Sequence, residues 1–260
     1  MAGYRIPGPL GTGSNTLQID SGTSARITSP LPGPIGTDAF NKYLANSTQG
    51  GIQIQQIQHI VSNISEEQRI LSALSYGEAS TSNVFEEMAA IANVIVRQAK
   101  ARGKTVSGLI KSDPDYSYAA NDGNQRYNLL MKASISDIEK DAGMSSALKG
   151  AENALTEGTD YSNGGYFWDG ADIKTNYRDH PKVKKGIKFT KPGHNIYKIA
   201  ESSVDVRIHW QAKDKTGKLV DGKERGRYTY TFESTAAYGG TIFWKYSDAF
   251  LNATSNKVYK

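Results

Sequence analysis

The spacing of apolar residues changes once along this 260-residue chain, and that change limits the folds open to it. Between residues 65 and 155 apolar side chains recur every three or four positions, which predicts amphipathic helices. From residue 204 onward they alternate with polar ones, as in Val204, Val206 and Ile208, which predicts half-buried antiparallel strands. The sequence therefore predicts an α+β fold with a helical region followed by an antiparallel β-rich region.

Three regions follow from this change and from composition. Residues 1–60 are rich in Gly, Pro and Ser, which indicates an extended leader with one short helix over Asp38–Ala45. Residues 61–180 form the helical region. Residues 181–260 form the β-rich C-terminal extension.

The helical region has clear start and stop signals. A first helix is predicted from Ser65, with Gln68 completing a capping box and Gly77 ending it. A second is predicted over Val84–Lys100, stopping at Gly103. The remaining helices are expected over Gln125–Lys140 and Ser145–Leu155.

The β-rich region is predicted as a hairpin and a last strand. Its hairpin strands are expected over Val204–Trp210 and Tyr228–Phe232. The polar segment between them contains three glycines and is interpreted as their connection. The last strand is expected over Thr241–Tyr246.

Composition excludes several classes of protein. The chain has no cysteine, which removes disulfide scaffolds, thiol nucleophiles and cysteine-ligated metal sites. No run of about 18 apolar residues is present, so no membrane insertion is expected. The first residues have no apolar core of a signal peptide. With 31 Lys+Arg against 26 Asp+Glu the net charge is +5, which favours anionic partners, but no nucleic-acid-binding motif accompanies it.

Glu78 is the candidate for acid chemistry. It follows Gly77 at the end of a mostly apolar helix, and a carboxyl that leaves a hydrophobic element into a cleft has a raised pKa and stays protonated near neutral pH. Such an acid protonates a glycosidic oxygen. The competing interpretation is a surface glutamate beside a C-capping glycine.

Four segments in order resemble the motifs of the cell wall hydrolase family that includes the spore cortex-lytic enzymes. They are Tyr76–Ala79, Glu86–Arg97, Tyr116–Tyr118 and Asp160–Trp168. The segment Trp168–Asp172 and the C-terminal extension look more like the lysozyme domain of bifunctional type VI secretion effectors than like the spore cortex-lytic enzymes. The resemblance covers residues 70–172, and it departs where Val96-Arg97-Gln98 stands in place of the family's Asn-Arg.

This resemblance implies a lysozyme-like helical fold that cuts the β-1,4 bond between N-acetylmuramic acid and N-acetylglucosamine. Glu78 stands at the position of the family's catalytic glutamate, and no cofactor is expected. The implied protein is an antibacterial toxin, delivered by a dedicated secretion machine to the target-cell periplasm. Its expected partners are peptidoglycan glycan strands, a carrier of the secretion system and an immunity protein.

Two further groups of residues are candidates for the site. Aromatic and turn residues that the resemblance brings near Glu78 suit sugar binding: these are Tyr116, Ser117, Tyr118, Asn163, Gly164, Gly165, Tyr166 and Trp168. A glycosidase normally uses a second carboxyl group. The candidates for it are Glu86, Glu87 and Asp169.

Three alternatives stay open. A lytic transglycosylase would need only Glu78, because the substrate's own hydroxyl closes a 1,6-anhydro ring. A non-catalytic cell-wall-binding module would use the β-rich region. A metal-dependent amidase would need a zinc site from His180 and His194 with Asp172 or Asp179, but no short ligand spacing supports it, so no metal is expected.

Overall fold

The computed structural model describes residues 64–116 and 123–258. Residues 64–260 form one compact unit. The predicted leader, with its short helix, lies outside the described residues. The mixed helix and strand content confirms the α+β class.

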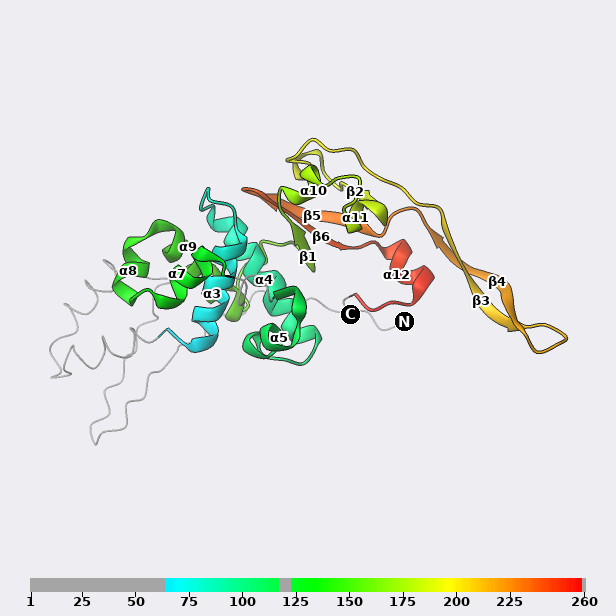
Figure 1. Ribbon diagram of the computed structural model, residues 1–260, viewed down its shortest axis with the longest axis horizontal. Helices are drawn as coiled ribbons and strands as arrows, with labels where there is room; N and C mark the ends of the chain where they lie inside the picture. Colours follow the sequence, from blue (N-terminus) through cyan, green and yellow to red (C-terminus); the bar gives the residue numbers. More distant parts are fainter. Residues whose placement is uncertain (1–63, 117–122, 259–260) are drawn as a thin grey trace, which may run out of the picture. The chain divides into compact units, whose positions relative to one another are not determined.

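Helices make up the first part of the described chain (Figure 1). The longer ones pack on one another, with α3, α4 and α9 in mutual contact and α7 and α5 against α3. Their bounds are α3 Glu66–Glu78, α4 Phe85–Ala101, α5 Val106–Ser112, α7 Gln125–Lys132, α8 Ile135–Lys140 and α9 Ala142–Leu155. The amphipathic pattern that predicted them also explains their packing, because each buries its apolar face in a shared core.

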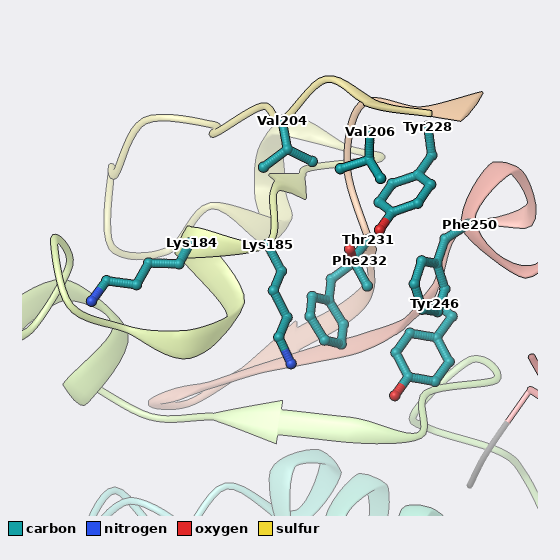
Figure 2. Close-up of a pocket in the computed structure, with 9 residues that line it drawn as sticks. All are labelled: Lys184, Lys185, Val204, Val206, Tyr228, Thr231, Phe232, Tyr246 and Phe250. Atoms are coloured by element: carbon teal, nitrogen blue, oxygen red, sulfur yellow. The ribbon is translucent and has the colours of Figure 1, made fainter. Parts of the chain in front are cut away.

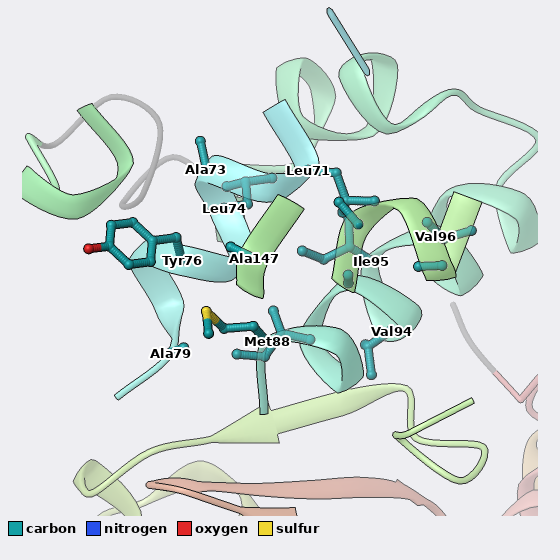
Figure 3. Packing of buried hydrophobic residues seen from close by; sticks show 14 of the residues in the cluster. Leu71, Ala73, Leu74, Tyr76, Ala79, Met88, Val94, Ile95, Val96 and Ala147 are labelled. Carbon is teal, nitrogen blue, oxygen red and sulfur yellow. The ribbon is translucent and has the colours of Figure 1, made fainter. Parts of the chain in front are cut away.

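That core is drawn in Figure 3. Leu71 and Leu74 of α3 meet Met88 and Ile95 of α4, and Ala147 of α9 fills the space between the helices; all five side chains are fully buried. The helices approach closely at Gly150, where an added Cβ would lie 3.0 Å from the Ala89 backbone.

A four-stranded sheet follows the helices in the chain. Its strand order is β1-β6-β5-β2, with β2 parallel to β5 and the other pairs antiparallel. The bounds are β1 Phe167–Asp169, β2 Ile187–Lys188, β5 Phe232–Tyr238 and β6 Thr241–Tyr246. Because β1 pairs with β6, this sheet crosses the boundary that the sequence predicted at residue 180.

A separate two-stranded ribbon is formed by β3 Val206–Lys213 and β4 Leu219–Tyr228. It packs against α12, Asp248–Thr254, and extends away from the four-stranded sheet (Figure 1). Short elements complete the described part: α10 Asp172–Thr175, α11 Pro181–Lys184 and the 3-10 turns η2 Pro114–Tyr116 and η3 Pro192–His194.

The structure corrects several of the predicted elements. Helix α3 does not stop at Gly77 but includes Glu78, because side chains from α7 cap the carbonyl groups at its end. The helix expected over residues 125–140 breaks at Ser134, whose hydroxyl caps α8 in a capping box. Helix α5 was not predicted; Thr105 caps its start.

A further correction concerns the hairpin. The polar segment expected to connect its strands is itself strand β4, and the turn lies at Asp214–Lys218. Residues 229–231 link β4 to β5 and do not belong to a strand. The last strand, Thr241–Tyr246, is confirmed with its predicted bounds.

Candidate functional site

The C-terminal end of α3 is held by side chains from the start of α7. Asn124, the N-cap of α7, donates from its amide nitrogen to the Gly77 carbonyl at 3.0 Å. Arg126 donates to the Ala79 and Ser80 carbonyls at 2.9 and 2.8 Å. Carbonyl groups at a helix end lack partners within the helix, so these bonds satisfy them and fix the helix end. The residue fixed at that end is Glu78.

Glu78 is half-buried, in contrast to a freely exposed surface glutamate. Burial raises the pKa of its carboxyl above the ordinary value, and a hydrogen bond from the Trp168 indole opposes this shift only in part. Desolvation disfavours the charged form, so the carboxyl keeps its proton to a higher pH than a solvated glutamate does. This is the property that a general acid near neutral pH requires.

Trp168 is itself supported from behind. The ring centres of buried Tyr116 and Trp168 are 6.2 Å apart. The Tyr116 hydroxyl donates a hydrogen bond to Gln98 Oε1 at 2.6 Å. Gln98 in turn donates to the Tyr166 carbonyl at 2.6 Å. Helix α4 therefore positions the aromatic residue that contacts the acid.

Glu87 joins the end of α3 to the turn between β5 and β6. It is fully buried in the first turn of α4. Its Oε1 accepts from the backbone N–H groups of Ser80 and Gly240 at 3.1 and 3.0 Å and from the Thr241 hydroxyl at 2.7 Å. Its Oε2 accepts from the Ser80 hydroxyl at 2.6 Å. These four bonds tie the segment that follows Glu78 to the turn between β5 and β6.

A pocket of about 420 Å³ lies at the same helix end. Gly77, Ala79 and Ser80 contribute to its wall, whereas the Glu78 side chain contacts Trp168. The opposite wall comes from residues 123–126, including the capping Asn124. The pocket therefore borders the backbone on either side of Glu78, and the Glu78 side chain is not part of its lining.

The residues expected to bind sugar fall into two groups. Trp168 is half-buried beside Glu78, and Tyr116, which is 4% exposed, supports it rather than facing solvent. Ser117 and Tyr118 lie outside the described residues.

The loop before β1 carries the other predicted sugar-binding residues. Asn163 and Gly164 form the predicted turn, with φ of +49° and +82°, and Gly165 follows it. The Arg97 guanidinium donates to Ser162 Oγ at 2.8 Å and lies 5.5 Å from the Tyr166 ring centre. The segment Val96-Arg97-Gln98, where the sequence departs from the family pattern, therefore anchors this loop through both of its polar residues.

The three candidates for the second carboxyl group have different surroundings. Glu87 accepts the four hydrogen bonds given above. Glu86 lies in the same helical turn. The pKa of Tyr238 is raised mainly by burial and further by the negative charge of Glu86. Asp169 follows Trp168 in β1, so the two side chains point to opposite faces of the sheet. Asp169 is buried on the face away from the helical core, and Lys182 contacts it at 2.8 Å.

Asp169 also belongs to a cluster with Asp172 and His180, the three residues whose possible ligand atoms lie within 4.8 Å of one another. His180 Nε2 is 3.4 Å from Asp169 and 3.2 Å from Asp172. The hydrogen bond to Asp169 raises the pKa of His180 above its ordinary value. With His180 protonated, His180 and Lys182 balance the charges of the two carboxylates, while Asp169 Oδ2 and His180 Nδ1 are buried without a hydrogen-bond partner among the described residues.

The other residues of the hypothetical zinc site lie elsewhere. His194 Nδ1 is 2.9 Å from Ser234 Oγ, in a hydrogen bond with that hydroxyl. Asp179 is paired with Lys184 at 2.8 Å. The structure brings Asp172 and His180 together and gives His194 and Asp179 other partners.

Sequence reasoning missed the residues that position the acid. Gln98 and Arg126 gave no signal, because their partners are backbone carbonyl and tyrosine groups that only the fold brings near. Asn124 carried a usable signal: an Asn directly before a helix is a typical N-cap.

No protein-family model, curated protein or solved structure gives a significant match to this chain. None of the helices in residues 64–116 and 123–258 has the length and apolar character needed to cross a bilayer.

Proposed function

We propose that this protein is a glycoside hydrolase of peptidoglycan, with Glu78 as the general acid. The observation that carries the proposal is the Glu78 carboxyl at the capped end of α3, where burial raises its pKa and the Trp168 indole donates a hydrogen bond to it. The resemblance of four ordered motifs to cell wall hydrolases supports the same residue. A lysozyme-like fold is part of this proposal.

The protonated Glu78 carboxyl donates its proton to the oxygen of the β-1,4 bond between N-acetylmuramic acid and N-acetylglucosamine as the C–O bond breaks. In the hydrolytic route, water attacks the sugar carbon. In the transglycosylase route, the sugar's own 6-hydroxyl attacks and forms a 1,6-anhydro ring. The positive charge of +5 favours association with an anionic wall.

The proposed setting follows from the resemblance to secreted effectors. A secretion machine delivers the protein to the periplasm of a target bacterium, where it acts as a toxin. A carrier and an immunity protein are its proposed protein partners.

The test is mass spectrometry of the products from purified peptidoglycan, with the wild-type protein and Glu78→Gln at equal concentration. We expect about 10²-fold to 10⁴-fold lower activity in the variant, the usual contribution of a general acid. Glu139→Gln, which changes an exposed carboxyl on α8, is the matched control and keeps full activity.

Three results have different meanings. Muropeptides with reducing ends support hydrolysis, and 1,6-anhydro products support the transglycosylase route with the same acid. Cleavage of stem peptides, or undiminished activity in Glu78→Gln, would overturn the proposal.

A further inference from the structure

A second pocket lies at the base of the β3–β4 ribbon, where β3 begins and β4 ends, and it shares no residue with the Glu78 site. Figure 2 shows this pocket, which has a volume of about 260 Å³. Tyr228, Tyr246 and Phe250 contribute aromatic rings to its wall. The Tyr246 and Phe250 ring centres are 4.9 Å apart and those of Tyr228 and Phe250 are 5.1 Å apart, so the wall is a packed, preformed aromatic surface.

Two lysine side chains also line this pocket. They are Lys184, the last residue of α11, and Lys185, which follows it (Figure 2). Lys184 is paired with Asp179 at 2.8 Å, whereas no ion pair engages Lys185 within residues 64–116 and 123–258. Lys185 is exposed, so its ammonium group is available to an anionic ligand.

The ribbon that leaves this pocket is strongly basic. Residues 206–228 contain seven Lys+Arg and three Asp+Glu, a net charge of 7 − 3 = +4, out of +5 for the whole chain. Like charges concentrated on one projecting element produce a local field that attracts polyanions.

The ribbon also exposes large apolar side chains. Trp210 is 57% exposed and Leu219 61%, and with Val220 they account for three of the six exposed large hydrophobic residues of the described chain. The Arg225 guanidinium lies 4.7 Å from the Trp210 ring centre. An exposed aromatic ring beside cations is a recognition surface rather than a packing surface.

We propose that the pocket and the ribbon form a non-catalytic binding site for an anionic glycan segment of the cell wall, an inference that rests on the proposed function. The aromatic wall contacts the C–H face of a sugar ring, and Lys185 pairs with a carboxylate carried by the glycan or its peptide. The ribbon's positive charge holds the continuing strand. A concave aromatic site suits a ring-bearing polymer better than a lipid surface, which cannot enter a concavity.

The experiment measures co-sedimentation of the protein with purified insoluble peptidoglycan, in the Glu78→Gln background so that the polymer is not degraded. Lys185→Glu and Trp210→Ala change exposed side chains, so we expect both variants to fold normally. We expect each to weaken retention about threefold to tenfold relative to the Glu78→Gln parent, whose own retention decreases as salt is raised.

Two matched controls keep their retention. Lys149→Glu makes the same charge change on α9, and Leu129→Ala removes an exposed apolar side chain from α7. Equal loss in Lys149→Glu would show a non-specific charge effect and overturn the site.

Other outcomes also overturn it: no retention of the parent protein, unchanged retention in both site variants, or stronger retention on anionic vesicles or DNA than on peptidoglycan. Failure of the proposed function is seen separately, as absence of glycan products with the wild-type protein. Peptidoglycan retention without such products would leave a wall-binding module.

Discussion

Glu78 combines a capped helix end with a desolvated carboxyl. Asn124 and Arg126 fix the carbonyl groups around it, so the side chain cannot escape to solvent by fraying of α3. The fold therefore keeps a carboxyl in a place where its charged form is disfavoured, which is expected of a functional residue and not of a surface one.

The first prediction concerns stability. The pKa of Glu78 is raised by burial, so between its ordinary value of 4.5 and its value in the folded state the fold binds more protons than the unfolded chain. Stability then falls as pH rises through that window. We expect Glu78→Gln to have a larger free energy of unfolding than the wild type at neutral pH, with the difference vanishing below pH 4.5. Urea unfolding at both pH values measures this, and a less stable variant at neutral pH contradicts it.

The second prediction concerns the pH dependence of activity. A general acid works in its protonated form, so activity falls as pH rises through the pKa of Glu78. The Trp168 hydrogen bond lowers that pKa, and Trp168→Phe removes the bond but keeps an aromatic ring. The alkaline limb of the pH profile should move to higher pH. Tyr116→Phe, which loses only the hydroxyl bonded to Gln98, should leave the limb in place.

Between elements, ion pairs connect short pieces that have little core of their own. Asp169 in β1, Asp172 in α10 and His180 before α11 lie in one cluster with Lys182. Helices of four residues are too short to be stable alone, so this network and the second hydrophobic core around Ile173 and Trp244 hold them.

The third prediction follows from that cluster. Because the hydrogen bond to Asp169 raises the pKa of His180, the folded state favours the protonated ring. This contribution is fully present below the unfolded value of about 6.5 and is lost as pH rises through the folded value. The wild type should lose stability across that range, and His180→Gln should lose less. Thermal unfolding between pH 6 and pH 9 measures the two slopes, and equal slopes would rule out this role.

The elements show how far the sequence can be interpreted. The 3.6-residue pattern predicted α3 and α4 within one or two residues, and the apolar run of β6 predicted its bounds. Strand β4 was missed because both faces of the ribbon are largely solvated, so its residues show no apolar alternation. The raised pKa of Glu78 was expected from its local setting, and its role as an acid stays a prediction. The contacts of Glu87 could not be predicted, because Gly240 is 153 residues away.

At the scale of the whole described unit, Glu87 connects the helices to the sheet. It bonds to Ser80 after α3 and to Gly240 and Thr241 at the start of β6. An added Cβ at Gly239 would lie 2.1 Å from Glu87 Oε2, so the turn also requires a residue without a side chain there.

The fourth prediction separates positioning from catalysis at Glu87. Glu87→Gln keeps an acceptor oxygen at Oε1 and places an NH₂ group beside the Ser80 hydroxyl. The hydroxyl oxygen can accept a hydrogen bond from that NH₂ group. We therefore expect near-normal stability and activity. Glu87→Ala leaves buried N–H groups without partners and should cost about 2–5 kcal/mol of stability. Denaturant unfolding and glycan product analysis measure both variants. A stable but inactive Glu87→Gln would instead identify Glu87 as the second catalytic carboxyl group.

The pairing of β1 with β6 sets an order of assembly. Trp168 lies in a three-residue strand whose sheet partner is β6, residues 241–246, more than 70 positions further along. Contacts between such distant segments form late, because a long loop must close first. During folding, the helices therefore form before Trp168 has a fixed position. By this order, Glu78 gains its indole partner only after β6 has paired with β1, so the hydrogen bond that lowers the pKa of its carboxyl is among the last contacts to form.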